Sequence, residues 1–123
     1  AGCAREGGRM KPKPPLERDV QRRVVAVYRA YGCHVYSLSQ GYRPGGAGHG
    51  TTRQTKGLGD LYVLHPGKRL VWWHETKREG GKLRPEQVQF CHANAQCAIR
   101  VVVGGVPEAL DALADMGFRV LKP

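Results

Sequence analysis

The run of residues 69–77, with the sequence RLVWWHETK, constrains the fold most. Its unbroken series of β-branched and aromatic residues predicts a β-strand. Because successive side chains of a strand point to opposite faces, Glu75 and Lys77 share one face with Val71 and Trp73. A carboxylate and a lysine at the end of an apolar strand are costly to bury unless they are paired or bind a metal. The run therefore predicts a strand that ends in a functional site, to which the rest of the chain brings ligands.

A predicted hairpin brings a second carboxylate to this site. Residues 60–65 form another strand, and a Pro-Gly turn joins the two strands. Their open ends then lie side by side, which places Asp60 near Glu75, with Lys77 just beyond. Two carboxylates beside a lysine suit a hard divalent cation such as Mg²⁺ or Mn²⁺, which prefers oxygen ligands. In the alternative interpretation, Asp60 caps the start of its strand and Glu75 forms an edge ion pair with Lys77.

This group of residues indicates phosphodiester hydrolysis. A bound cation offsets the negative charge of a phosphate, polarises its oxygen and lowers the pKa of a bound water. Lys77 can orient or deprotonate that water, or stabilise the pentacoordinate phosphorus. We expect the backbone carbonyl of Thr76, which lies between Glu75 and Lys77, to complete the coordination.

The charge of the chain predicts a nucleic-acid partner. The 123 residues include 20 Lys and Arg against 10 Asp and Glu, a net charge of +10, which is typical of domains that contact a phosphate backbone. An anionic membrane is a weaker alternative, because no helix combines a basic face with a bulky apolar face. No run approaches the ~18 apolar residues of a membrane span. Charge alone does not separate an enzyme from a passive binder.

Apolar periodicity and turn residues divide the chain into a tail and one domain. Residues 1–15 are rich in Gly, Pro and basic residues and are expected to be a flexible tail, whereas residues 16–123 form a single α/β domain. The predicted elements are a helix over 16–31, strands over 33–38, 60–65 and 69–77, a helix over 84–95, a strand over 98–103, a helix over 107–116 and a strand over 118–121. The order α-β-β-β-α-β-α-β predicts a mixed sheet flanked by helices.

The second predicted helix is expected to bury Val88, Cys91 and Ala95. None of the four cysteines lies in a Cys-x-x-Cys pair, so we expect Cys91 and Cys97 to be core thiols rather than zinc ligands. Free thiols, with no apolar leader at the N-terminus, predict a reducing cytosol.

A long glycine-rich loop over residues 40–59 contains Arg43, Arg53 and Lys56 and no acid. A loop of this length is usually functional or disordered. It is either a mobile basic flap that closes over nucleic acid or a plain surface loop. A phosphate-binding P-loop is rejected, because Thr51 stands where the lysine of that motif should be.

Three parts of the chain carry a resemblance to a known family. Gly59-Asp60 followed, one hairpin later, by Glu75-Thr76-Lys77 resembles the PD-(D/E)XK nuclease motif, in the strand-hairpin-strand context that this motif requires. The first helix carries Glu17 and Gln21 as Glu-x-x-x-Gln. The run 78–87, R-x-G-G-x-L-x-P-E-Q, is similar to the pattern of VRR-NUC (virus-type replication-repair nuclease) domains.

The resemblance covers about residues 16–116 and implies a PD-(D/E)XK restriction-endonuclease-like fold. It implies a structure-selective DNA endonuclease that uses Mg²⁺ or Mn²⁺ and no small-molecule cofactor. Stand-alone members of the family resemble resolvases that cut Holliday junctions as homodimers, and they occur in bacteria and phages, so the cytoplasm of a bacterial or phage-infected cell is the expected location. Flap cleavage, general duplex cleavage and a non-catalytic basic DNA-binding module are the alternatives. Acids that face a phosphate repel it, which argues against the passive module.

The resemblance also implies a role for each matching residue. The implied metal ligands are Asp60, Glu75 and Glu17, beside the carbonyl of Thr76 expected from its place between Glu75 and Lys77. The implied catalytic group consists of Lys77, the two ligands Asp60 and Glu75, and Gln87, with Gln21 as an accessory residue. The basic residues expected to contact DNA are Arg43, Arg53, Lys56, Arg78, Lys82 and Arg84. The chain departs from the family pattern before Asp60, where Leu58-Gly59 replaces a proline, and at Thr76, where an apolar residue is common and the side chain faces away from the site.

Overall fold

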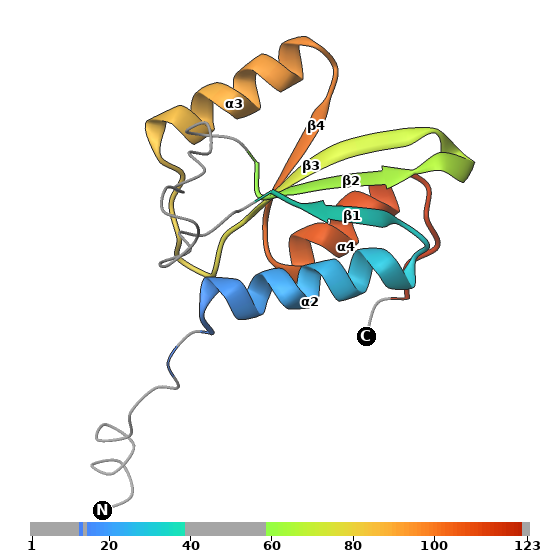
Figure 1. Ribbon diagram of the computed structural model, residues 1–123, viewed down its shortest axis with the longest axis horizontal. Helices are drawn as coiled ribbons and strands as arrows, with labels where there is room; N and C mark the ends of the chain where they lie inside the picture. The colour runs from blue at the N-terminus through green and yellow to red at the C-terminus, as the bar shows by residue number, and fades with distance from the viewer. Residues whose placement is uncertain (1–12, 14, 39–58, 122–123) are drawn as a thin grey trace, which may run out of the picture.

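The computed structural model describes residues 13, 15–38 and 59–121, which form a mixed sheet with helices on both faces (Figure 1). The elements are α2 (Glu17–Ala30), β1 (His34–Ser37), β2 (Leu61–His65), the 3-10 turn η1 (Pro66–Lys68), β3 (Leu70–Thr76), α3 (Pro85–Gln96), β4 (Arg100–Gly104) and α4 (Val106–Asp115). The strand order is β1-β2-β3-β4, with antiparallel pairing from β1 to β3 and a parallel pair between β3 and β4. The predicted α/β fold is confirmed, and so is the order of its elements as far as the last helix.

Some predictions fall outside the described residues. These are nearly all of the predicted tail over 1–15 and of the predicted loop over 40–59, with Arg43, Arg53 and Lys56. Among the helices of the described part, none is long and apolar enough to cross a membrane.

The hairpin between β2 and β3 forms as the Pro-Gly pair predicts. The turn is one turn of 3-10 helix, in which His65 Nδ1 accepts a hydrogen bond from the backbone N–H of Lys68 at 3.0 Å. In the register of the two strands, Leu61 pairs with His74. Asp60, one residue before β2, therefore lies opposite Glu75 at the open end of the hairpin.

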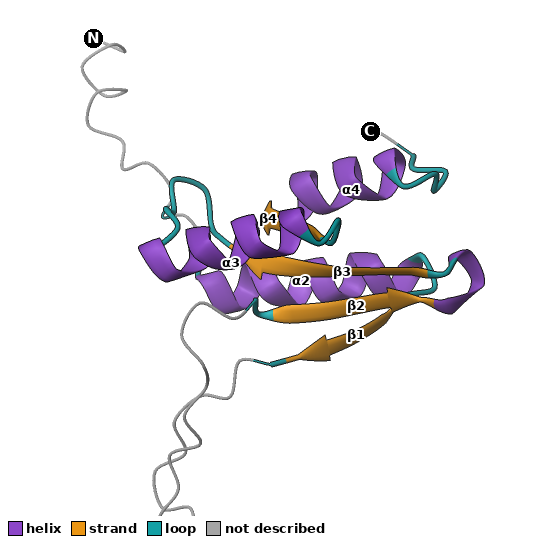
Figure 2. Cartoon of the chain, turned by 90° about the horizontal axis from the view of Figure 1, so that it is seen from above, coloured by secondary structure: helices purple, strands orange, loops and turns teal. Residues whose placement is uncertain are grey.

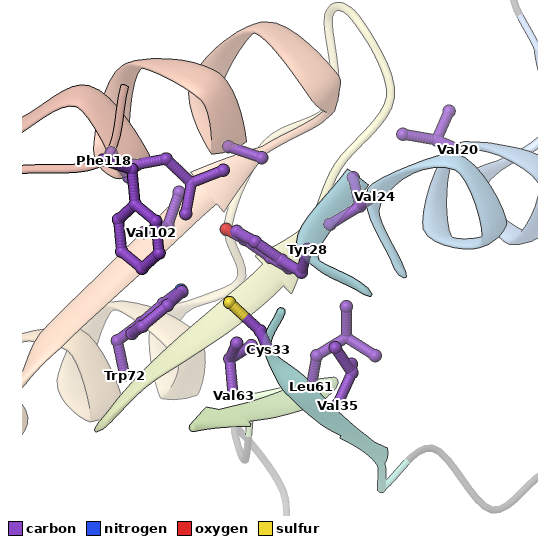
Figure 3. Close-up of a cluster of buried hydrophobic side chains, with 13 residues drawn as sticks. Val20, Val24, Tyr28, Cys33, Val35, Leu61, Val63, Trp72, Val102 and Phe118 are labelled. Atoms are coloured by element: carbon purple, nitrogen blue, oxygen red, sulfur yellow. The ribbon is translucent and has the colours of Figure 1, made fainter. Parts of the chain in front are cut away.

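The core lies between the sheet and the pair of helices α2 and α4 (Figure 3). The apolar stripe of α2 supplies Val20, Val24 and Tyr28, and the ring of Tyr28 packs edge-on against Trp72 of β3 with centroids 5.5 Å apart. Even-numbered residues of β3 face this layer, so Trp72, His74 and Thr76 are all fully buried. By alternation, the odd-numbered Trp73 and Glu75 face the other side of the sheet.

A buried polar pair joins α2 to β3 within this core. His74 Nε2 lies 2.9 Å from the carbonyl of Gly104, which can only accept, so Nε2 carries the proton and donates. The other ring nitrogen, Nδ1, therefore accepts from the hydroxyl of Tyr28 at 2.6 Å. Burial lowers the pKa of His74 to about 4 and raises the pKa of Tyr28 above its usual range, so both groups stay neutral. This hydrogen-bonded chain fixes the helix against the strand that carries Glu75.

The other face of the sheet is only partly covered. Figure 2 shows α3 over the β3–β4 side, and no described helix lies over β1 and β2 on this face. The ring of Phe90 in α3 packs edge-on against Trp73 with centroids 5.1 Å apart. The prediction that α3 buries Val88, Cys91 and Ala95 is wrong, because Gln87 is the buried residue of this helix, while Val88 and Ala95 are exposed and Cys91 is half-buried.

Two further predictions are corrected. No strand forms over 118–121, because Phe118 turns its ring into the core, where it packs against Trp72 and Tyr31 with centroids 6.4 Å and 6.2 Å apart. Cys97 is exposed rather than a core thiol, because it lies at the C-terminal cap of α3, beyond the part of the helix that contacts the sheet.

Candidate active site

Two carboxylates lie side by side at the open end of the β2–β3 hairpin. The backbone N–H of Asp60 donates to Glu75 Oε2 at 3.2 Å, and the backbone N–H of Thr76 donates to Asp60 Oδ2 at 3.0 Å. The carbonyl of Asp60 also accepts from the N–H of Leu38, just after β1, at 2.8 Å. Each carboxylate is thus held by the backbone of the opposite strand, and their juxtaposition follows from the strand register.

Gln87 fixes the Glu75 side chain from the first turn of α3. Its Oε1 accepts from the backbone N–H of Arg84 at 2.8 Å, so its Nε2 is turned towards Glu75 and donates to Oε1 of that carboxylate. Gln87 is 5% exposed and Glu75 is 3% exposed. Pro85 sets the start of α3, and this start places the Gln87 side chain in the site. Gln87 then orients the Glu75 carboxylate.

Lys77 lies between a buried acid and an exposed one. Its Nζ is 3.9 Å from Glu75 Oε1 and 3.8 Å from Glu17 Oε1 on α2. The backbone N–H of Lys77 donates to the carbonyl of Gly104 at 3.1 Å, which continues the β3–β4 pairing beyond Thr76 and holds the lysine at the end of the strand. The lysine side chain is largely buried, whereas that of Glu17 is half exposed.

Without a bound cation, it is unfavourable for both carboxylates to be ionised at once. Burial, followed by the neighbouring charge of Asp60, raises the pKa of Glu75 to about 7, although Lys77 opposes the shift. Burial also raises the pKa of Asp60, although the N–H of Thr76 opposes that shift. A positive charge between the two groups would relieve both effects, because it favours the ionised form of each carboxylate.

The donor set fits a hydrated hard cation rather than a closed protein cage. In the described part of the chain, no group of three or more His, Cys, Asp or Glu side chains is arranged to hold a metal by itself. Mg²⁺ retains several waters and is commonly bound through one or two carboxylates together with substrate phosphate oxygens. Asp60 and Glu75 supply such a pair, and Glu17 stands across Lys77 from them.

A comparison with solved structures identifies the fold. A structure described as a VRR_NUC domain superposes on this chain with a TM-score of 0.60 and 25% sequence identity, over 83% of this chain and 97% of that one. The chain carries a VRR-NUC domain. Domains of this kind are nucleases of the PD-(D/E)XK type, so the predicted family and fold are both confirmed. No protein-family model matches the chain, and no curated protein matches it in sequence.

The other predicted residues of the VRR-NUC domain lie at different distances from this centre. Gln21, one turn after Glu17, donates its amide hydrogen to Ser37 Oγ at 3.4 Å and thus contacts the end of β1. Arg78, Lys82 and Arg84 follow Lys77 and are exposed, with Arg84 at the N-cap of α3. Their proposed contacts with DNA, and the roles assigned to the site residues, remain predictions.

A cavity of about 660 Å³ opens beside Lys77 in the VRR-NUC domain, between α2, the segment that follows β3 and the start of α4. Arg23 and Arg78 are among the residues that line it. Arg23 was not among the functional residues predicted from the sequence. Its position three residues after the buried Val20 was the available signal, because residues i and i+3 of a helix share a face.

Proposed function

We propose that this VRR-NUC domain is a Mg²⁺- or Mn²⁺-dependent endonuclease that hydrolyses DNA phosphodiester bonds and prefers branched DNA such as Holliday junctions. The observation that carries the proposal is the pairing of Asp60 and Glu75, with the Lys77 ammonium 3.9 Å from Glu75. Acids of this kind repel a phosphate unless a cation intervenes, so a passive DNA-binding module gains nothing from them.

Asp60 and Glu75 would hold the cation, with Glu17 and the carbonyl of Thr76 as further ligands. When bound, the cation offsets phosphate charge and makes water a better nucleophile near neutral pH. Gln87 keeps one oxygen of Glu75 engaged and so orients the other. Gln87 would therefore act as a positioning residue, which orients Glu75 and does not itself contact the reacting groups.

Lys77 is the residue we expect to act on the reacting groups. Its Nζ, largely buried between two acids, lies where it can hold the attacking water or neutralise charge on the phosphorus oxygens. The side chain reaches the edge of the 660 Å³ cavity, which gives a substrate strand access to it. Arg23 and Arg78 on the walls of that cavity would attract the phosphate backbone.

Cleavage of a four-way junction requires two symmetric cuts, which a two-fold dimer supplies. In the proposed dimer, two copies meet along β4 and α4. In support of this arrangement, β4 is an edge strand of the described sheet. Light scattering of the purified protein measures the mass of the particle, and a monomer at the concentrations used for cleavage would contradict this part of the proposal.

The deciding experiment compares end-labelled four-way junction, flap and linear duplex, each with Mg²⁺, Mn²⁺ or EDTA. Asp60→Ala and Lys77→Ala proteins are assayed in parallel. We expect metal-dependent cutting of the junction that both substitutions abolish. Absence of metal-dependent cutting on all three substrates refutes the enzyme proposal. Equal cutting of junction and duplex leaves a general nuclease and removes the preference for branched DNA.

The net charge of +10 gives an independent check on the substrate. Each phosphate neutralised by Lys or Arg releases counterions, so the logarithm of the affinity falls linearly with the logarithm of the salt concentration. We expect affinity for DNA to drop by roughly tenfold or more between low and physiological salt. An affinity for DNA that does not change with salt concentration would show that the basic residues do not bind the phosphate backbone.

A further inference from the structure

The sheet face that carries Glu75 also carries a row of aromatic side chains. In the strand register, Tyr36 of β1 pairs with Tyr62 of β2, and Tyr62 pairs with Trp73 of β3. The ring centroids are 6.4 Å apart in the first pair and 5.0 Å apart in the second, and both pairs are tilted rather than edge-on. We call these three residues the aromatic row.

The aromatic row is closed at one end and open at the other. At the β3 end, Phe90 of α3 packs edge-on against Trp73 at an interplanar angle of 84°. At the β1 end, Tyr36 is 52% exposed, and Tyr62 between them is half-buried. No described helix packs over Tyr36 and Tyr62, so among the described residues their rings are available to an external ligand, whereas Trp73 is held as part of the fold.

The aromatic row lies directly beside the carboxylates. The next pair along the same strands and on the same face is Asp60 and Glu75, two residues from Tyr62 and Trp73. Two residues of a strand span about 6.6 Å, so the aromatic row and the carboxylate pair can contact the same segment of a DNA strand. Gly59, the residue before Asp60, packs closely against two rings at this end of the row. A Cβ atom at Gly59 would lie only 3.1 Å from Trp73 and 3.3 Å from Phe90. The segment that delivers Asp60 therefore packs on the end of the aromatic row.

We propose that the aromatic row stacks unpaired bases of the DNA strand whose phosphate lies at the carboxylate pair. The proposal rests on the proposed nuclease function and specifies its substrate as DNA with unpaired bases next to the cleavage point. Base–aromatic stacking tolerates any sequence, because every base has a flat π-face. Bases stacked inside an intact duplex cannot reach Tyr36 and Tyr62, so the row selects strands that leave the duplex, as at a branch or a flap.

Two observations favour DNA over a second copy of the chain as the occupant. Each chain carries a net charge of +10, which attracts a polyanion. A copy seated on Tyr36 and Tyr62 would also lie next to Asp60 and Glu75 and block substrate from them. The remaining apolar residue of this face with high exposure, Val71, stands one row further from the carboxylates and provides a control position.

The test measures DNA affinity of the full chain in EDTA, by fluorescence anisotropy of labelled oligothymidylate and of a blunt duplex of equal length. The variants are Tyr36→Ala, Tyr62→Ala and their combination, with the matched Phe substitutions, which keep the ring. Val71→Ala removes exposed apolar surface from the same face without removing a ring. Thermal unfolding of each variant establishes that it folds.

We expect each Tyr→Ala substitution to weaken single-strand binding by about five- to 150-fold. Duplex affinity should change little, and the Phe variants and Val71→Ala should bind as the unsubstituted protein does. Equal losses on both DNAs, or no loss on the single strand, overturn the proposal. If the Ala variants turn a dimer into a monomer in sedimentation while single-strand affinity stays, the row is an interface between copies, which also overturns it.

This outcome is separable from that of the cleavage assay. Binding is measured without metal, so a protein that cuts no DNA can still show the predicted preference of the aromatic row for unpaired bases. Conversely, a protein that cuts junctions with unchanged single-strand affinity in the Tyr36→Ala and Tyr62→Ala variants retains the nuclease function and lacks the proposed base-binding site.

Discussion

The backbone N–H of Asp60 donates to the Glu75 carboxylate across the open end of a hairpin, at 3.2 Å. This bond ties the position of one acid to the position of the other, because the two residues occupy opposite places in one strand register. The site is therefore a property of the β2–β3 hairpin, and helices α2 and α3 complete it with one side chain each.

Substitution of Lys77 by Ala should lower the rate of DNA cleavage by roughly 100-fold or more, because general acid–base groups contribute on this scale. The fold should persist, since the backbone N–H of Lys77 still donates to Gly104. Single-turnover cleavage with Mg²⁺ measures the effect. Lys68→Ala, at the far end of the hairpin in η1, is the matched control and should keep the rate. A Lys77→Ala protein that cuts normally would remove the lysine from the mechanism.

Substitution of Gln87 by Ala should weaken Mn²⁺ binding or cleavage by roughly 10- to 100-fold, the usual cost of removing a partner that orients a metal ligand. The physical reason is the loss of the donor that engages Glu75 Oε1. Calorimetric titration with Mn²⁺ measures the affinity directly. Gln89→Ala changes an exposed residue of the same helix and should have no effect. Equal behaviour of the two variants would show that Gln87 does not position the carboxylate.

In EDTA, the free energy of unfolding should fall as the pH rises from about 4.5 towards 7. The folded state raises the pKa of Glu75 from 4.5 to about 7, so it holds a proton that the unfolded state has already released. That contribution is fully present below the unfolded pKa and is lost as pH rises through the folded one. The slope is at most about 1.4 kcal/mol per pH unit for one carboxyl group.

Urea unfolding across this pH range measures the slope. Glu75→Gln should flatten it, because the amide does not titrate, and Mg²⁺ should raise the stability most at the upper end of the range. A slope that is unchanged in the Glu75→Gln protein would assign the pH dependence to other groups.

Substitution of Tyr28 by Phe should destabilise the protein by about 1–3 kcal/mol, because it leaves the buried His74 Nδ1 without its donor. Chemical denaturation measures this difference. Tyr36→Phe removes a hydroxyl from an exposed ring and should stay within about 0.5 kcal/mol of the unsubstituted protein. Similar values for the two substitutions would show that the Tyr28–His74 bond contributes nothing to stability.

The hairpin and its carboxylate pair were predictable because the signals are local. A Pro-Gly pair between two runs of β-formers predicts the turn, and the alternation of side chains then places Asp60 and Glu75 at the same end. The resemblance to VRR-NUC domains added Glu17 and Gln87, which helical periodicity alone does not bring to the strand. The structure places Glu17 beside Lys77 and Gln87 against Glu75.

The errors share a physical cause, which is that burial depends on what an element packs against. Val88 and Ala95 have helical spacing typical of a core face, yet α3 contacts the sheet through Gln87 and Phe90 and leaves them in solvent. Residues 118–121 alternate in a strand-like way, but a strand exists only with a partner to supply its hydrogen bonds. The ring of Phe118 instead fills the core beside Trp72.

The sequence by itself determined the elements as far as the last helix, the central hairpin and the two acids at its open end, because propensity, turn chemistry and side-chain alternation act over a few residues. The tertiary structure alone decided which helix faces are buried, how Gln87 orients Glu75, and which surface stays open beside the site. Those outcomes depend on the packing of segments distant in sequence, as in the bond from Tyr28 to His74 that fixes α2 against β3. The row of Tyr36 and Tyr62 next to the carboxylates depends on the assembly of the sheet, because strand pairing brings these residues together.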